Sequence, residues 1–244
     1  SFSSHKGSKE FFGPHTKGFC NVPFDNLDAL EKIFIQDKNI AGFLVEPIQG
    51  EAGVIVPKDG YLEGVRKLCT KYNVLFVADE IQTGLGRTGK LLATQYEDSK
   101  PDILILGTAL SAGTFPVSAV LSNSEIMDVI KPGQHGSTFG GNPLGASISK
   151  SALEIIINEK LTENAKKLGT FFREKINAYI KNSQLIKLVR GKGLLNAIVV
   201  NDSKRNTQTA WNICLRLKDK GLLAKPTHGN IIRFAPPLVM TEAQ

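Results

Sequence analysis

Short apolar runs that alternate with amphipathic segments constrain the fold of this chain more than any other feature. Runs 41–46 and 74–79 are mostly apolar and each ends in an acid, and residues 60–72 between them place apolar side chains on one helical face. Further buried strands are expected at 103–107 and 117–121. This alternation is typical of an α/β fold with a mostly parallel sheet.

The pattern changes near residue 150, which predicts a second, smaller domain. Residues 142–180 read as helix with a break near 159–161. Strand-like stretches and one more helix follow, at 185–190, 194–200, 207–220 and 231–234. We therefore expect residues 1–150 to form the C-terminal portion of a large α/β domain, and residues 151–244 to form part of a smaller α+β C-terminal domain.

Composition excludes several classes of protein. The 244 residues are 41% hydrophobic and 22% charged, as in an ordinary globular protein, and no apolar run approaches the roughly 20 residues that cross a bilayer. Residues 151–225 hold 15 Lys/Arg against 6 Asp/Glu, but without interleaved aromatic residues, which favours a solvated face over nucleic-acid binding. Because Cys20, Cys69 and Cys214 are far apart, they argue against a zinc site and fit a reducing compartment.

Both ends of the sequence predict a fragment of a longer protein. Residues Ser1–Ser4 carry no initiating Met and no targeting pattern. The last residues, Met240–Gln244, read as the start of a helix with Thr241 as its cap.

Residues Gly84–Gly89 read GLGRTG, a formal GxGxxG. A dinucleotide-binding loop leaves a strand directly and opens a helix. Here four residues separate Gly84 from the strand end at Asp79, and no clear helical face follows. A dinucleotide-binding domain is therefore an alternative that rests on this motif alone.

Polar residues at three places are candidates for a ligand site. Asp79 ends a strand at the carboxyl edge of the sheet, where ligands bind in open α/β folds; it either pairs with a cation such as a protonated ring nitrogen or caps the next turn. Residues 135–143 form either a phosphate cradle or an ordinary helix entry. Arg233 lies in an apolar strand and requires an anion, which is Glu46, Glu51 or a substrate.

Taken together, five strings resemble the ornithine aminotransferase family, within the fold-type I aminotransferases that depend on pyridoxal 5'-phosphate (PLP). They are VEPIQGEAGV (45–54), LFVADEIQTGLGRTG (75–89), HGSTFGGNPL (135–144), RGKGLLNA (190–197) and GLLAKPTHGNIIRFAPPL (221–238). The resemblance implies a fold-type I large domain, PLP as cofactor, an amino acid and a 2-oxo acid as substrates, and a homodimer or higher homo-oligomer. It implies no nucleic-acid partner and no membrane partner. It also implies that the protein is located in the mitochondrial matrix or the cytoplasm.

The resemblance also implies residue roles at the cofactor. Asp79 matches the aspartate that pairs with the pyridinium nitrogen, and Gln82 matches the residue that hydrogen-bonds the phenolic oxygen. Ser137 and Thr138 match the pair that reaches the phosphate of the neighbouring subunit's cofactor.

At the substrate, Arg233 matches the arginine that binds the α-carboxylate of glutamate or 2-oxoglutarate. Glu51 matches the glutamate that pairs with this arginine while ornithine presents its δ-amino group. Glu46 matches a buried structural acid near the site.

One departure from the family pattern bears on catalysis. Where the family reads Leu-Gly-Lys-Ala-Leu-Ser-Gly-Gly, residues 106–113 read LGTALSAG. Thr108 replaces the Schiff-base lysine, and a hydroxyl can supply neither the covalent nitrogen nor the amine base. Ala112 replaces a glycine in a turn that favours positive φ.

The resemblance implies, as the ancestral chemistry, transfer of the δ-amino group of ornithine to 2-oxoglutarate, which gives glutamate semialdehyde and glutamate. The alternative is a non-catalytic protein that binds PLP or pairs subunits. Whether Thr108 is natural, engineered or an error stays open at this stage.

Overall fold

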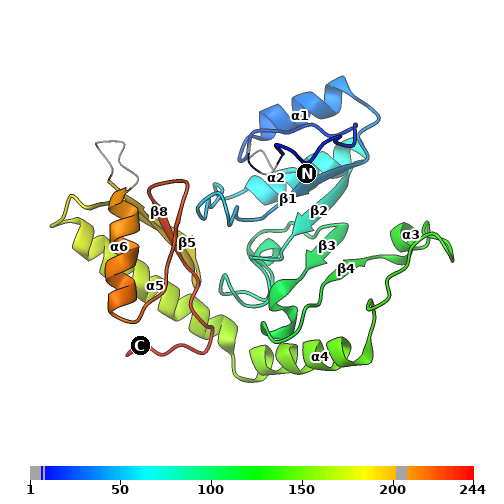
Figure 1. The fold of residues 1–244 in the computed structure, drawn as a ribbon. Helices are drawn as coiled ribbons and strands as arrows, with labels where there is room; N and C mark the ends of the chain where they lie inside the picture. The colour runs from blue at the N-terminus through cyan, green and yellow to red at the C-terminus, as the bar shows by residue number, and fades with distance from the viewer. Residues whose placement is uncertain (1–6, 8, 202–207) are drawn as a thin grey trace.

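The computed structural model describes residues 7, 9–201 and 208–244, which form two four-stranded sheets (Figure 1). The first sheet has the order β1 (Gly42–Val45), β2 (Leu75–Asp79), β3 (Ile103–Leu106), β4 (Ala119–Ser122). The second has the order β5 (Ile186–Lys192), β6 (Leu195–Val200), β8 (Ile231–Phe234), β7 (Pro226–Thr227).

The first sheet confirms the predicted α/β architecture. β1 pairs in parallel with β2, and β2 in parallel with β3. β4 runs antiparallel to β3 as the edge strand, a direction that the apolar pattern of 117–121 does not encode. Helices α1 (Leu27–Gln36) and α2 (Tyr61–Tyr72) pack together beside β1 and β2, and they bury Phe34 and Val65 in one core with Phe76.

The second sheet is antiparallel throughout, as an α+β unit requires. Helix α5 (Leu161–Ile180) packs along β5, and α6 (Gln208–Asp219) packs near β8. Helix α6 confirms the helix expected at 207–220, apart from residue 207, which lies outside the described residues.

A long helical segment joins the two sheets. Helix α4 (Pro143–Asn158) contacts η3 (Thr108–Ser111) below the first sheet, and α5 continues to the second (Figure 1). Lys160, at φ +51°, separates the two helices, which confirms the predicted break. Residue 150 lies inside α4, and the domain boundary at 150 stays a prediction.

The remaining helical pieces are short: η2 (Ala93–Tyr96) and α3 (Ser124–Met127). Residues 241–244 form no helical turn, although the Gln244 N–H donates to the Thr241 hydroxyl at 3.4 Å. In the described ranges no helix combines the length and hydropathy needed to cross a bilayer, and no group of three or more potential metal ligands lies together.

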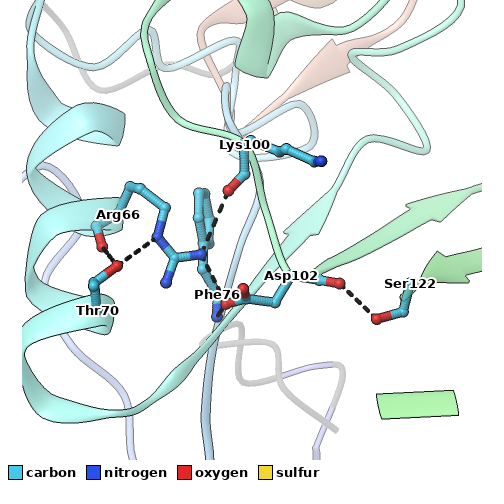
Figure 2. A network of polar contacts seen from close by, with 6 residues as sticks. All are labelled: Arg66, Thr70, Phe76, Lys100, Asp102 and Ser122. Carbon is cyan, nitrogen blue, oxygen red and sulfur yellow. Dashed lines mark hydrogen bonds and ion pairs between the residues drawn. The ribbon is translucent and has the colours of Figure 1, made fainter. Parts of the chain in front are cut away.

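Asp102 joins helix α2 to two strands of the first sheet (Figure 2). Its Oδ2 accepts hydrogen bonds from Arg66 Nη1 of α2 and from the backbone N–H of Phe76 in β2, both at 2.7 Å. Its carbonyl oxygen accepts from the Ser122 hydroxyl of β4 at 2.6 Å. Because Phe76 is fully buried, its N–H depends on this carboxylate.

We predict that Asp102→Ala lowers the free energy of unfolding by about 2–3 kcal/mol, because it strands a buried N–H and a half-buried guanidinium. Urea denaturation measures the loss. The matched control is Glu63→Ala, which removes an exposed ion pair with Lys67 and is expected to cost less than about 1 kcal/mol. Equal losses for the two variants would contradict the role given to Asp102.

Candidate functional site

A loop after β1 crosses from the first sheet to the second. The Gly50 N–H donates to Glu46 Oε2 at 2.8 Å, and Gln49 and Ile55 pair through backbone hydrogen bonds of 3.1 and 2.9 Å. We call residues 49–55 the Glu51 loop. Its buried Val54 packs in one apolar cluster with residues of the second sheet. The loop therefore presents Glu51 to β8.

Arg233, Glu51 and Gln82 meet between the two sheets. Arg233 Nη1 lies 2.6 Å from Glu51 Oε1 and donates to Gln82 Oε1 at 2.8 Å. The structure thus pairs Arg233 with Glu51 rather than with Glu46. The Arg233 side chain is 25% exposed and that of Glu51 is 63% exposed. An ion pair this exposed contributes only about 0–1 kcal/mol, so an incoming carboxylate can replace Glu51 at small cost.

Gly50 makes room for Gln82. A Cβ at position 50 would lie 2.6 Å from Gln82 Cδ, a distance that packed atoms do not reach. The side-chain amide of Gln82 therefore lies directly against the backbone of the Glu51 loop, with its oxygen on Arg233.

A buried carboxylate anchors the turn that carries Asp79 and Gln82. Glu80 is fully buried and accepts hydrogen bonds from the Thr83 hydroxyl (2.7 Å), the Ala93 N–H (2.8 Å) and both the N–H and the hydroxyl of Thr94 (2.8 and 2.9 Å). Four donors satisfy the charge without a cation. This role of Glu80 was not predicted from the sequence, where its signal is an acid directly after an apolar strand.

Asp79 lies at the carboxyl end of β2. Its Oδ1 accepts the Ile81 N–H at 3.0 Å, as in a turn cap. In the part of the chain that the structure describes, no ion pair joins a cation to Asp79. A carboxylate in this position is suited to a ligand that carries positive charge.

Charges converge around Glu46. Burial raises the pKa of Glu46 above its ordinary value; the Gly50 N–H opposes the rise, the charges of Asp79 and Glu51 add to it, and Arg233 lowers the pKa. The protonation of Glu46 is therefore coupled to the charges of the neighbouring site residues.

Thr108 and Ala112 lie after β3, at the same edge of the first sheet as Asp79. Asp79 is in register with Ile105, three residues before Thr108. Thr108 is exposed and has a φ of +37°. Ala112 has a φ of +53°, the positive value expected at a position where the family has glycine. A β-branched residue in this region is strained.

Ser137 and Thr138 lie in an exposed loop before α4. Ser137 Oγ accepts the Gly140 N–H at 3.0 Å, and Asn142 caps α4 by accepting the Gly145 N–H at 2.7 Å. Among the described residues no hydrogen bond joins this loop to Asp79 or Arg233, so the geometry within one chain is that of a helix entry.

The Gly84–Gly89 loop does not have the geometry of a dinucleotide site. It forms a series of turns rather than opening a helix. Arg87 Nη1 donates to the carbonyl oxygens of Pro236 and Leu194, and the Leu194 N–H donates to the Arg87 carbonyl. The loop packs against residues that flank β6 and β8 of the second sheet, which removes the basis of the dinucleotide alternative.

Comparison with known proteins decides the family. The family model described as "Aminotransferase class-III" matches residues 1–244. The chain belongs to this aminotransferase family. It is 59% identical over 244 residues to "Ornithine aminotransferase, mitochondrial" of Drosophila melanogaster and 57% identical over 242 residues to that of Rattus norvegicus. The alignments cover 100% and 99% of this chain but 55% and 54% of those proteins, so the chain spans about half of their length.

Solved structures agree on the fold. An ornithine aminotransferase from Toxoplasma gondii matches 98% of this chain and 56% of its own with a TM-score of 0.94 at 47% identity. An acetylornithine aminotransferase from Elizabethkingia anophelis matches 94% of this chain and 60% of its own with a TM-score of 0.91 at 61% identity. Class-III aminotransferases depend on PLP, and this chain has their α/β fold.

We predict that Glu46→Gln stabilises the protein near neutral pH but not near pH 4. Because the folded-state pKa of Glu46 is raised, the folded state binds the proton more strongly, and stability falls as pH rises from the ordinary carboxyl pKa of about 4.3 through the raised one. Glutamine keeps an acceptor for the Gly50 N–H and removes this loss.

Thermal unfolding between pH 4 and pH 8 measures the effect. The matched control is Glu159→Gln, an exposed carboxylate after α4, which is expected to leave the profile unchanged. A difference in Tm between Glu46→Gln and the parent that stays constant across this pH range would show that the prediction is wrong.

Proposed function

We propose that this chain forms part of an ornithine aminotransferase site in which the cofactor is bound without a covalent link. The family reaction moves the δ-amino group of ornithine to 2-oxoglutarate and gives glutamate semialdehyde and glutamate. Relatives named ornithine aminotransferase, at 53–59% identity over 244 residues, support this assignment. The observation that carries it is the exchangeable Glu51–Arg233 pair.

The pair suits a site that accepts two different substrate ends in turn. 2-Oxoglutarate brings a carboxylate next to its reacting carbon, and Arg233 can bind it once Glu51 moves away. The δ-end of ornithine carries no carboxylate, so an uncovered Arg233 would be left without an anion. Glu51 then covers Arg233, and in this arrangement Gln82 also accepts a hydrogen bond from the guanidinium.

The remaining residues fit PLP in all respects but one. Asp79 would hold the protonated pyridine nitrogen, Gln82 the phenolic oxygen, and Ser137 and Thr138 the phosphate of a second subunit's cofactor, so we propose a homodimer. Bound PLP supplies an electron sink for the carbon that loses its proton. Thr108 supplies no amine, and loss of a general base alone typically slows a reaction by about 10²–10⁴.

Thr108 also favours the second candidate, a protein that binds PLP or pairs subunits without catalysis. The substrate itself has a competitor, because the Elizabethkingia anophelis structure is named for acetylornithine. For the location we propose the mitochondrial matrix or the cytoplasm; the Drosophila melanogaster and Rattus norvegicus relatives are named mitochondrial.

We predict that Thr108→Lys in the full-length protein with PLP raises ornithine-dependent formation of glutamate semialdehyde at least about 10²-fold, because it restores both the covalent nitrogen and the amine base. Thr108→Met is the matched control, since it relieves the same β-branched strain without an amine. N-Acetylornithine is assayed in parallel.

A gain with ornithine for the lysine variant alone supports the proposal. A gain only with N-acetylornithine would move the substrate assignment to the acetylated diamine. A folded lysine variant that gains with neither substrate would overturn catalysis and leave the non-catalytic candidate.

A further inference from the structure

Two side chains of the second sheet hold the backbone of the Glu51 loop, one at Glu51 itself and one at Gly53. Arg190 donates to the Gly53 carbonyl oxygen from both Nε (3.0 Å) and Nη2 (2.8 Å). The Thr227 hydroxyl donates to the Glu51 carbonyl oxygen at 3.0 Å. The Glu51 loop is thus fixed at two carbonyls, neither of which involves the Glu51 carboxylate.

Strand register places Arg190 and Arg233 on one face of the second sheet. Arg190 of β5 is opposite Ala197 of β6, which is in turn opposite Arg233 of β8. Directly opposed residues share a face, and two strand spacings separate the two arginines by about 10 Å. The Glu51 loop therefore lies over both, with its backbone on Arg190 and its carboxylate on Arg233.

Arg190 is used for position rather than for charge. Both of its hydrogen bonds go to one carbonyl, and among the described residues no carboxylate pairs with it. Burial lowers the pKa of its guanidinium. Gly53, at φ +104°, permits this approach, since a Cβ there would lie 2.7 Å from Ile231 Cδ1 and 3.2 Å from Arg190 Nη2.

We infer that Arg190 and Thr227 are positioning residues that set how strongly Glu51 covers Arg233. The inference rests on the proposed function, in which a substrate carboxylate competes with Glu51. A loop fixed at both carbonyls holds Glu51 next to Arg233 without the entropy cost of ordering it. If the loop is loosened, Glu51 becomes a weaker competitor and a dicarboxylate binds more tightly. A merely structural role would have the opposite effect, because disorder in the site weakens binding.

The test measures the Kd of glutarate, a dicarboxylate without a reactive oxo group, by calorimetry on the full-length protein saturated with PLP. Arg190→Gln and Thr227→Val are each expected to lower this Kd about three- to tenfold. The matched control is Arg173→Gln. Arg173 is also half-buried and bound to a carbonyl, that of Gly193, but it does not touch the Glu51 loop. It should leave the Kd unchanged or raise it.

Glu51→Gln separates failure of the inference from failure of the proposed function. It should lower the glutarate Kd, and adding Arg190→Gln to it should produce no further decrease, because the two changes act through one contact. If Glu51→Gln does not tighten binding, the proposed competition at Arg233 is wrong. If Glu51→Gln tightens binding while Arg190→Gln and Thr227→Val do not, the positioning roles alone are overturned.

Discussion

The Glu51 loop leaves the carboxyl end of the first sheet and packs on the second, and the candidate site depends on this crossing. Ile48 and Val54 are buried in one cluster with Ala197 and Ile231, and burial of a Val or Ile side chain contributes about 1.5–3 kcal/mol. This apolar contact and the hydrogen bonds from Arg190 and Thr227, rather than the exposed Glu51–Arg233 pair, fix the loop. The ion pair can therefore open and close without unfolding the site.

A second crossing reinforces the first. Arg87 of the Gly84–Gly89 loop donates hydrogen bonds to the carbonyl oxygens of Leu194 and Pro236. The loop lies so close to the second sheet that a Cβ at Gly193 would overlap the backbone of Thr88. Gly193 of the RGKG string thus permits contact between the backbones of the two segments. With both crossings in place, Gln82, three residues after Asp79, accepts a hydrogen bond from Arg233 of β8.

Thr108 bears on the catalytic step rather than on ligand binding. Thr108 and Ala112 both have positive φ values, although neither a β-branched residue nor alanine favours them. The charged and amide groups around Arg233 do not depend on this position. We therefore propose that binding of the cofactor and of carboxylate ligands persists, while the proton transfer that needs an amine is lost.

Much of the fold followed from the sequence because buried strands and amphipathic helices leave local patterns. The segments around β1, β2 and α2 and the break at Lys160 are of this kind. Helix α1 was missed, although Asn26 caps it by accepting the Ala29 N–H at 2.9 Å. No local sequence pattern indicates that β4 is antiparallel. The same holds for the hydrogen bond from Arg190 to Gly53, which lie 137 residues apart. Long-range partners of this kind required the structure.

The central claim is that the site keeps the residues that bind PLP and substrate without covalent bonds. It lacks the lysine that would form a covalent bond to PLP, because Thr108 stands in its place. The most direct measurement is a PLP titration of the full-length protein by visible absorbance, followed by borohydride reduction and intact mass. The account predicts saturable binding that Asp79→Asn weakens, and no gain of mass after reduction. A cofactor-sized gain of mass at saturation would contradict it, because a lysine would then reach the aldehyde despite Thr108.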